Sequence, residues 1–484
     1  MKAMSNQHTS GPLRLAFYGD DFTGSTDALE VLAFSGLRCA LFLSVPTPAQ
    51  MEALGGFDAI GVAGSSRAMT TAELDAHLPG VFAKLAALRT PLVHYKVCST
   101  FDSAPATGSI GHVMELARDA FRQPLIPIVA ATPALGRYCL FGHLFARSAT
   151  DGKIYRIDRH PIMSVHPVTP MHESDLALHL GQQTTMAIGN LPLTSFDSTS
   201  GSMAEQVTAM AGSSQAVVLD GLDAGHLTLA GECLQQMASV QAKPLLVVGG
   251  SGVEYGLTQY WKQQDGQPAI AAETTTEAAD HYSQFEAVDQ VLVVSGSASR
   301  LSATQIQAAV DAGFREVAVD VQALSQVSQV GAVVESLVRA VLEALATGAS
   351  VVMHTARGPE DTRIDALVQA LREQGYSADA ARHHGGRLVS DCLSEAVDAI
   401  VRAHPLRRLV LSGGDTSSRI TQVLGPDALE IRARLAPGAP LCRLLSSTPH
   451  LQGLELALKG GQMGSADYFV KALKGSAMPA RVDR

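Results

Sequence analysis

The feature that most constrains the fold of this chain is an alternation of short apolar runs with longer amphipathic stretches. Such runs, rich in β-branched residues, are typical of strands buried on both faces of a sheet. In the first half of the chain they are Leu13–Tyr18, Arg38–Leu43, Ala59–Ala63, Leu92–Val97, Leu125–Ala130 and Ala216–Leu219. In the second half they are Gln290–Val294, Glu316–Val321, Ser350–His354 and Arg408–Leu411. Helical segments such as Thr71–Leu88 and Gly111–Arg122 lie between several of them, so the alternation predicts mostly parallel sheets covered by helices.

The alternation is interrupted once, which predicts a domain boundary. A chain of 484 residues suffices for two or three domains. Between Tyr260 and Ala287 the sequence is rich in Gln, Thr, Glu, Asp and Ala and contains no strand-like run. We predict an N-terminal segment (1–12), a domain over 13–260, a linker over 261–288 and a second domain over 289–484. The predicted fold is two mostly parallel-sheet α/β domains with an active-site cleft between them.

Charge and composition exclude several classes of protein. The net charge of −10 argues against a general nucleic-acid binder, which would need a basic surface. Six scattered cysteines without metal-ligand spacing indicate a reduced, cytoplasmic protein. The polar start resembles no signal peptide, and no apolar run approaches the roughly 18 residues of a membrane span. We therefore expect small-molecule partners, neither nucleic acid nor membrane, and leave a homo-oligomer open.

Polar residues follow the first predicted strand, where ligands bind in open α/β sheets. Asp20 and Asp21 stand between Gly19 and a predicted helix. One interpretation is a helix N-cap, in which a carboxylate accepts hydrogen bonds from free backbone N–H groups. The other is a carboxylate that binds a polyol or takes its proton.

Two further strand ends favour a binding site. Arg67 follows a third strand and can hold a carboxylate with two hydrogen bonds. Lys96 lies in an otherwise apolar strand, where an unpaired charge is costly, so it needs an anion or a carboxylate. Internal pairing of Lys96 with Asp102 is an equally open interpretation. The candidate substrate-binding residues are Asp20, Arg67, Lys96, Cys98, Ser99, Thr100, Asp102 and Ser103. Together they indicate a pocket for a small polyhydroxylated carboxylic acid.

The second predicted domain has three glycine-rich turns, two of them between a strand and a helix. Glycines at helix N-termini let backbone N–H groups approach phosphate oxygens. No GxxxxGK[ST] motif and no complete GxGxxG fingerprint after a strand is present, so these turns predict phosphate binding of another kind. The candidate ATP-binding residues are Ser295, Gly296, Ser297, Gly413, Gly414, Asp415, Thr416, Gly461 and Gly464.

Several other residues carry weaker expectations. His354 at a strand end is interpreted as packed or capping rather than catalytic, and Arg357 as able to reach a phosphate. His383–Arg387 lacks metal-ligand spacing and is expected to form a turn that leads into a helix near the nucleotide. The polar connection from Asp158 to Met171 is expected to cover the first pocket. Lys459 is left open, as a phosphate contact or a solvated strand residue.

Four motifs, in their order and placement, resemble those of the four-carbon acid sugar kinases, a group once described only as a domain of unknown function. They are Gly19–Gly24, Lys96–Ser103, Ser412–Ser417 and Lys459–Gly464. The resemblance covers nearly the whole chain. It implies that the N-terminal domain binds the acid and the C-terminal domain binds ATP, with phosphorylation at the terminal hydroxyl of a four-carbon acid sugar.

Carried over by position, the resemblance implies an acid site lined by Asp20, Arg67 and Lys96–Ser103. It likewise implies an ATP site lined by Ser295, Gly413–Thr416 and Gly461. The run Cys98–Ser103 resembles that of the 3-oxo-tetronate kinase branch, with a threonate or erythronate kinase as the alternative.

The mechanism predicted at this point is phosphoryl transfer. Arg67 and Lys96 would hold the carboxylate, Mg²⁺ would bridge phosphate oxygens, and Asp20 or Asp21 would orient or deprotonate the hydroxyl. An alternative of another class is a non-catalytic nucleotide or metabolite sensor. A dehydrogenase is disfavoured because the expected glycine fingerprint is missing after the first strand.

Overall fold

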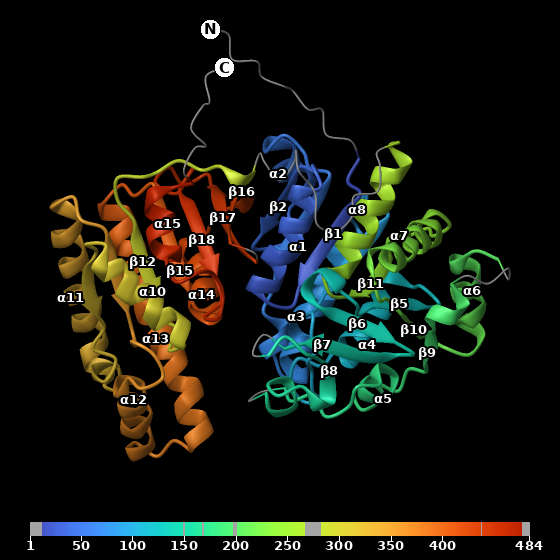
Figure 1. Cartoon of the computed structure of the whole chain (residues 1–484), viewed down its shortest axis with the longest axis horizontal. Helices are drawn as coiled ribbons and strands as arrows, with labels where there is room; N and C mark the ends of the chain where they lie inside the picture. Colours follow the sequence, from blue (N-terminus) through green and yellow to red (C-terminus); the bar gives the residue numbers. More distant parts are fainter. Residues whose placement is uncertain are drawn as a thin grey trace, which may run out of the picture. The chain divides into compact units, whose positions relative to one another are not determined.

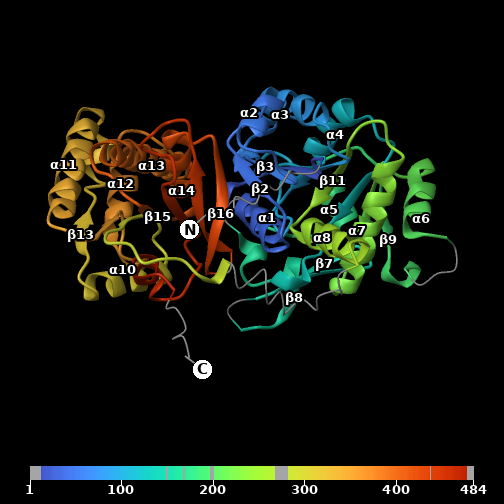
Figure 2. The same cartoon turned by 90° about the horizontal axis from the view of Figure 1, so that it is seen from above.

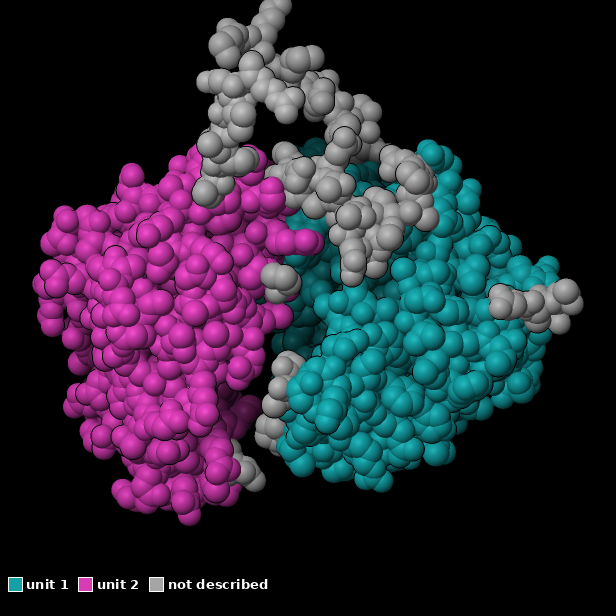
Figure 3. Space-filling view, viewed as in Figure 1, with its two compact units in different colours: residues 1–276 teal, residues 277–484 magenta. Residues whose placement is uncertain are grey.

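The chain folds into two compact units, residues 1–276 (unit 1) and 277–484 (unit 2), which Figure 3 colours separately. The structure, a computed structural model, describes residues 12–148, 151–166, 169–196, 201–266, 282–436 and 438–476. The predicted N-terminal segment and most of the predicted linker lie outside these ranges. The predicted cleft between the two domains stays a prediction. Among the described residues, no helix is long and apolar enough to cross a membrane.

The main sheet of unit 1 is parallel throughout, as the apolar runs predict. Its strand order is β2-β3-β1-β4-β11-β5-β10-β9. The strands are β1 (Leu15–Gly19), β2 (Cys39–Phe42), β3 (Ala59–Ala63), β4 (Leu92–Lys96), β5 (Ile126–Val129), β9 (Ile188–Leu191), β10 (Ala216–Leu219) and β11 (Leu245–Gly249). Every residue of β1, β4 and β11 is buried, which explains why β1 and β11 are apolar rather than alternating, whereas β4 also buries His94 and Lys96.

Helices cover both faces of this sheet. They are α1 (Phe22–Phe34), α2 (Pro48–Ala53), α3 (Thr71–Ala86), α4 (Ile110–Phe121), α5 (Leu176–Gly181), α6 (Met203–Ala209), α7 (Ala224–Ser239) and α8 (Gly252–Gln264). Figure 2 shows α2, α3 and α4 on one face and α1, α7 and α8 on the other. Local sequence fixes where they begin. In α3, for example, the side chains of Thr70 and Glu73 form a capping box.

A small antiparallel sheet in unit 1 was not predicted. It contains β6 (Arg137–Leu140), β7 (His143–Arg147) and β8 (Ile154–Arg156). Asp220, which follows β10, anchors the β6–β7 turn because its carboxylate accepts hydrogen bonds from the backbone N–H groups of Phe141 (2.5 Å) and Gly142 (2.9 Å). Three short 3₁₀ turns complete the neighbouring connections: η2 (Pro133–Leu135), η3 (Ile157–Arg159) and η4 (Met163–Val165).

The sheet of unit 2 is mixed, with order β13-β14-β12-β15-β18-β17-β16. The strands are β12 (Leu292–Ser295), β13 (Arg315–Ala318), β14 (Val351–His354), β15 (Arg408–Ser412), β16 (Ala428–Ala436), β17 (Ala439–Leu445) and β18 (Glu455–Lys459). The pairs from β13 to β18 are parallel, whereas β17 runs antiparallel to both β18 and β16. The four predicted strands of this half are present, and the two antiparallel pairings were not predicted.

The helices of unit 2 correct one expectation. They are α10 (Arg300–Asp311), α11 (Val327–Ala346), α12 (Thr362–Glu373), α13 (Ala378–Ala403), α14 (Gly414–Leu424) and α15 (Tyr468–Lys474), and Figure 1 places them around the strands. His383–Arg387 lies inside α13, so the predicted helix-leading turn there is wrong. The adjacent Gly385 and Gly386 favour a turn in the sequence, but the residues on both sides of them are helical and the helix continues through them.

Candidate functional site

The polar residues singled out in the first half of the sequence gather at the carboxyl edge of the unit 1 sheet. Gly19 of β1 is in register with Ala63 of β3 and with Lys96 of β4, and Lys96 is in register with Gly249 of β11. The segments that follow these strands are therefore neighbours. The backbone N–H of Asp20 donates to the Lys96 carbonyl (2.8 Å), and that of Arg67 donates to the Asp20 carbonyl (3.0 Å).

Asp21 is the N-cap of α1, which confirms the capping interpretation for one of the two acids. Its Oδ1 accepts a hydrogen bond from the Gly24 N–H at 2.6 Å, while its Oδ2 lies 2.9 Å from an Nη1 of Arg67. Burial alone would lower the pKa of Arg67, but the acidic groups around it raise the pKa instead, so the guanidinium is always charged. With 31% of its side chain exposed, Arg67 can still reach a ligand.

Asp20, in contrast, has no capping role. The residue is 3% exposed, and its Oδ1 is buried with no hydrogen-bond partner among the described residues. Burial raises its pKa to about 7, Asp21 adds to that effect, and Arg67 and Lys96 oppose it. A carboxyl group that titrates near neutrality at a strand end is suited to take up a proton.

The charge partner of Lys96 is Asp27, which the sequence analysis missed. Lys96 Nζ lies 3.9 Å from an Asp27 carboxylate oxygen and donates to the Val97 carbonyl at 3.0 Å. The interpretation that Lys96 pairs internally is confirmed, but its partner is Asp27 and not the Asp102 that this interpretation named. Burial alone would lower the pKa of Lys96, but Asp27, Asp20 and Asp21 outweigh it, so its ammonium group stays charged. Asp27 lies within α1, and its contact with Lys96 of β4 depends on how this helix packs on the sheet, so spacing along the chain gave no signal for it.

The loop after β4 is held in a strained conformation by its own polar groups. Phe101 adopts the left-handed region (φ 56°), which L residues rarely occupy. Asp102 fixes the loop by accepting hydrogen bonds from the hydroxyls of Thr100 (2.5 Å) and Thr169 (2.8 Å). Burial raises the pKa of Asp102, but Arg67 and these hydroxyls outweigh it, so its pKa lies below the ordinary value. The contact from Thr169 shows that the long connection reaches the loop after β4, and its predicted covering of the pocket stays a prediction.

The remaining candidates of this loop differ in accessibility. Ser99 is partly exposed and makes no side-chain hydrogen bond with the described residues. Burial raises the pKa of the Cys98 thiol to about 11, so this cysteine is protonated. Ser103 is buried, and its hydroxyl contacts Nε2 of His179 (2.9 Å) and the side-chain amide of Gln183 (2.9 Å). His179, whose pKa burial lowers to about 4, is therefore a neutral support of the loop that the sequence analysis missed.

In unit 2 the predicted nucleotide-binding turns also meet at the carboxyl edge of the sheet. Ser295, Ser412 and Lys459, the last residues of β12, β15 and β18, are successive register partners. The loops that follow are tied together because the Gly296 N–H donates to the Ser412 carbonyl (2.9 Å), and the Ser299 hydroxyl donates to the Gly461 carbonyl (2.5 Å). The three loops are far apart along the chain, and the pairing of β12, β15 and β18 brings them together.

Close approach explains the glycines at this edge. A Cβ on Gly296 would lie 1.9 Å from Thr416 Oγ1, and one on Gly461 would lie 2.4 Å from Ser297 Oγ. Gly413 and Gly464 have positive φ values of 114° and 83°. These distances and φ values give the four glycines a structural reason.

The first turn of α14 has no side-chain cap. Its N-cap is Gly413, which offers no side chain to accept from the helix N–H groups. Gly414 is partly buried, Thr416 is buried and Asp415 is exposed. Among the described residues, no cluster of three or more His, Cys, Asp or Glu side chains is arranged to hold a metal ion. Asp415 is a hard oxygen donor beside this turn, which fits Mg²⁺ carried mainly by phosphate oxygens.

His354 and Arg357 are engaged by protein groups. Nε2 of buried His354 lies 2.7 Å from Glu316 Oε1, and its Nδ1 lies 3.2 Å from an Arg363 nitrogen. Arg357 forms an ion pair with the same glutamate (3.2 Å). The expectation that His354 is a packed residue is confirmed.

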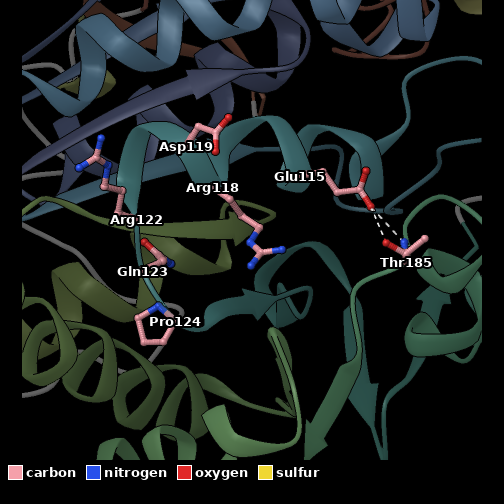
Figure 4. A pocket seen from close by; sticks show the side chains of 7 residues that line it. All are labelled: Glu115, Arg118, Asp119, Arg122, Gln123, Pro124 and Thr185. Atoms are coloured by element: carbon pink, nitrogen blue, oxygen red, sulfur yellow. Dashed lines mark hydrogen bonds between the residues drawn. The ribbon is translucent and has the colours of Figure 1, made fainter.

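A separate hollow of about 700 Å³ in unit 1 contains none of the candidate residues. Figure 4 shows its lining side chains, with the Glu115 carboxylate turned toward Thr185. The hollow lies beside the end of α4 and Gln123 and Pro124, which lead into β5. It is therefore at the amino edge of the sheet, opposite the edge where ligands bind in this class of fold.

Comparisons with known proteins assign both units. Residues 15–257 match a family described as a sugar-binding N-terminal domain, and residues 292–469 match one described as a nucleotide-binding C-terminal domain. The chain is 40% identical over 461 residues to a 3-oxo-isoapionate kinase of Paraburkholderia graminis, covering 94% of this chain and 93% of that protein. It is 31% identical over 478 residues to a 3-oxo-tetronate kinase of Burkholderia multivorans, covering 96% and 97%.

Solved structures agree with the fold. A Salmonella typhimurium LT2 protein superposes with a TM-score of 0.72 at 25% identity, covering 95% of this chain and 98% of that one. A Haemophilus influenzae protein superposes with a TM-score of 0.67 at 24% identity, covering 94% and 98%, and shows the fold alone.

These matches define an enzyme class, the carbohydrate-acid kinases. Within it, the chain belongs to the four-carbon acid sugar kinase family, as its motifs predicted.

Proposed function

We propose that this kinase transfers the γ-phosphoryl group of ATP to the terminal hydroxyl of a small 3-oxo sugar acid. The observation that carries this proposal is Asp20. Its carboxyl group follows β1 at the carboxyl edge of the unit 1 sheet, in the part of the chain that matches a sugar-binding domain. Its Oδ1 is buried with no hydrogen-bond partner among the described residues, and burial raises its pKa to about 7. Such a group can accept the hydrogen bond, and then the proton, of a substrate hydroxyl.

Arg67 is the group best suited to bind the carboxylate of the acid. Asp21 occupies one edge of its guanidinium, and the partial exposure of the side chain leaves other N–H groups for a ligand. Lys96 is buried and lies 3.9 Å from an Asp27 carboxylate oxygen, so a protein carboxylate offsets its charge and Arg67 is left as the more accessible cation. The unpaired hydroxyl of Ser99 is available to a substrate hydroxyl or oxo group.

The proposed phosphoryl transfer forms one bond, breaks one bond and moves one proton to Asp20. The substrate oxygen attacks the γ-phosphorus, the bond between that phosphorus and the β–γ bridging oxygen breaks, and ADP leaves. The hydroxyl proton passes to the Asp20 carboxylate as the new phosphate ester forms. Since phosphoryl transfer depends mainly on positioning and charge stabilisation, Asp20 and Arg67 act chiefly by fixing the acceptor.

ATP is proposed to bind in unit 2 at the edge formed by Ser295, Gly413–Thr416 and Gly461. The first turn of α14, which has no side-chain cap, and the close-packed glycines support this location. Mg²⁺, when bound, would neutralise charge on the phosphates, and Asp415 would hold it on the protein side.

For the acid itself, we propose 3-oxo-isoapionate first and 3-oxo-tetronate second. The first rests on the 40% identity to a kinase of that name, compared with 27% to 31% for the kinases named for 3-oxo-tetronate. The second rests on the resemblance of Cys98–Ser103 to the 3-oxo-tetronate branch. Both are 3-oxo acids, so the acceptor chemistry is the same.

A coupled assay of ADP release tests the proposal. Mg²⁺-ATP is offered with 3-oxo-isoapionate, 3-oxo-tetronates, threonates, erythronates and 4-hydroxythreonate, each against a control without acid. We expect the highest kcat/KM with a 3-oxo acid. Turnover confined to threonate or erythronate would overturn the substrate, and binding of ATP without turnover of any acid would support the sensor alternative.

A further inference from the structure

Lys459 is a buried lysine without a protein counter-ion. It is the last residue of β18 and is 1% exposed. Its Nζ donates to the Ser412 hydroxyl at 3.0 Å and lies 5.9 Å from the centre of the Phe469 ring. Within the described ranges, no carboxylate lies within ion-pairing distance of this nitrogen. The sequence left Lys459 open between a phosphate contact and a solvated strand residue, and its burial excludes the second.

The other two cations that are at most 1% exposed among the described residues, Lys96 and Arg408, are compensated. Lys96 has Asp27 at 3.9 Å, and Arg408, which is also fully buried, is paired with Glu455. Burial lowers the pKa of Lys459 to about 8, whereas the carboxylates around Lys96 raise the pKa of that residue. A buried ammonium without an anion destabilises a folded protein, so its presence at a strand end calls for a ligand.

The groups beside Lys459 are also donors in need of an acceptor. Because Ser295, Ser412 and Lys459 are register partners on parallel strands, their side chains lie on one face of the sheet. The Ser295 hydroxyl is buried and has no hydrogen-bond partner among the described residues. Gly460 and Gly461, which follow Lys459 directly, belong to the predicted ATP loop. The combination of ammonium, hydroxyl and glycine loop is suited to an anion.

We propose that Lys459 is a ligand of the nucleotide polyphosphate, binding a phosphate oxygen through its ammonium group. This inference rests on the proposed function, since it takes ATP as the nucleotide bound by unit 2. In this proposal, Lys459 is the protein cation that offsets the negative charge of the phosphates. The glycine loops then supply backbone N–H groups, and Lys459 supplies the charge.

If Lys459 is a buried charge without a partner, its removal should not destabilise the ligand-free protein. Lys459→Met keeps the apolar stem and removes the uncompensated charge, so the melting temperature of the ligand-free protein should stay equal or rise. The same variant should bind ATP and ADP roughly 10- to 100-fold more weakly, the range expected when a hydrogen bond to a charged group is lost. A residue with only a structural role would show the opposite combination, with lower stability and unchanged affinity.

The test is calorimetric titration of the full chain with Mg²⁺-ATP, ADP and adenosine, together with thermal shift by inorganic tripolyphosphate. Lys459→Met is compared with the wild type, with Lys459→Gln as a second variant and with Lys474→Met, an exposed lysine of α15, as the matched control. We expect weaker ATP and ADP binding and a smaller tripolyphosphate shift in both Lys459 variants. Adenosine binding should not change, and the control should behave as the wild type.

Three results would overturn the proposal. If the Lys459 variants bind ATP as tightly as the wild type and the wild type is active as a kinase, Lys459 is not a nucleotide ligand, while the proposed function stands. An equal loss for adenosine would indicate collapse of the site, and a raised KM for the acid with unchanged ATP binding would make Lys459 an acid-binding residue. If the wild-type protein itself fails to bind ATP, the proposed function falls together with this inference.

Discussion

Asp20 and Asp21 are adjacent acids whose environments assign them different roles. Asp21 caps α1 and pairs with Arg67, so its oxygens are occupied by protein groups. Asp20 is buried beside it with an unpartnered oxygen, and its pKa is raised. Pairs of titratable groups whose pKa values are pushed apart by their surroundings are a common basis for acid–base assignments. At the residue scale, Asp20 is therefore the base that we propose.

Replacement of Asp20 by asparagine should remove most turnover. Asparagine keeps the size of the side chain but cannot take the proton, so we expect kcat to fall by roughly 10²- to 10⁴-fold, the usual contribution of a general base. The Kd for ATP, measured by calorimetry, should not change. Asp119→Asn, which alters an exposed acid on α4, is the control. Near wild-type kcat in Asp20→Asn would show that another group accepts the proton.

The pH dependence of kcat/KM should follow the same carboxyl group. Since Asp20 acts unprotonated and burial raises its pKa to about 7, kcat/KM should fall as the pH drops below 7 and level off above it. Asp21, Arg67, Lys96 and Asp102 are the charged groups that act on it. A profile without this limb between pH 5.5 and 7.5 would contradict the assignment.

The raised pKa of Asp20 also affects folding. Its folded pKa lies above the ordinary value of 3.8, so the folded state binds the proton more tightly and this group costs stability as the pH rises from about 4 to about 7. Asp20→Asn should therefore have a higher melting temperature than the wild type at pH 8, with the difference shrinking toward pH 4. A lower melting temperature of the variant at pH 8 would argue against a destabilising carboxylate.

At the scale of elements, Asp21 at the start of α1 has two contacts: it caps the helix, and it pairs with Arg67, the proposed ligand of the acid. Asp21→Ala should lower the free energy of unfolding by about 1 kcal/mol through loss of the cap. Asp21→Ser retains a capping oxygen and removes the partner of Arg67, so it should recover most of that stability. Both variants should raise the KM for the acid, because Arg67 loses its anchor. Urea unfolding and steady-state kinetics measure the two effects, and equal destabilisation by Ser and Ala would contradict the capping role.

Charged residues hid some strands from the sequence but not all, since β4 and β13 were predicted although they contain Lys96 and Glu316. Uninterrupted runs such as that of β1 were predicted within a residue or two. β18 was missed because it begins with Glu455 and ends with Lys459, charges that are buried because one pairs with Arg408 and the other donates to Ser412. β16 alternates polar and apolar residues, a period-two signal of a half-buried strand that was available. Positions after predicted strands located most of the candidate site, whereas Thr169 and His179 reach it only through long-range folding.

At the scale of the whole molecule, the acid and the nucleotide are assigned to different units. Hydrogen exchange can locate each ligand separately. ATP should slow exchange in peptides that cover residues 295–299, 412–417 and 459–464, and the acid should slow it in those that cover 19–24, 64–67 and 96–103. Peptides around the hollow beside α4 are the internal control. Protection of the unit 1 segments by ATP alone would contradict the assignment of ligands to units.

The most direct test of the kinase assignment is the fate of the γ-phosphoryl group, followed by ³¹P NMR in a mixture of the protein, Mg²⁺-ATP and 3-oxo-isoapionate. We predict that a phosphomonoester signal grows in step with ADP and that Asp20→Asn abolishes both. Release of inorganic phosphate without a phosphomonoester would show hydrolysis rather than transfer. Unchanged ATP with every 3-oxo acid would contradict the proposed reaction.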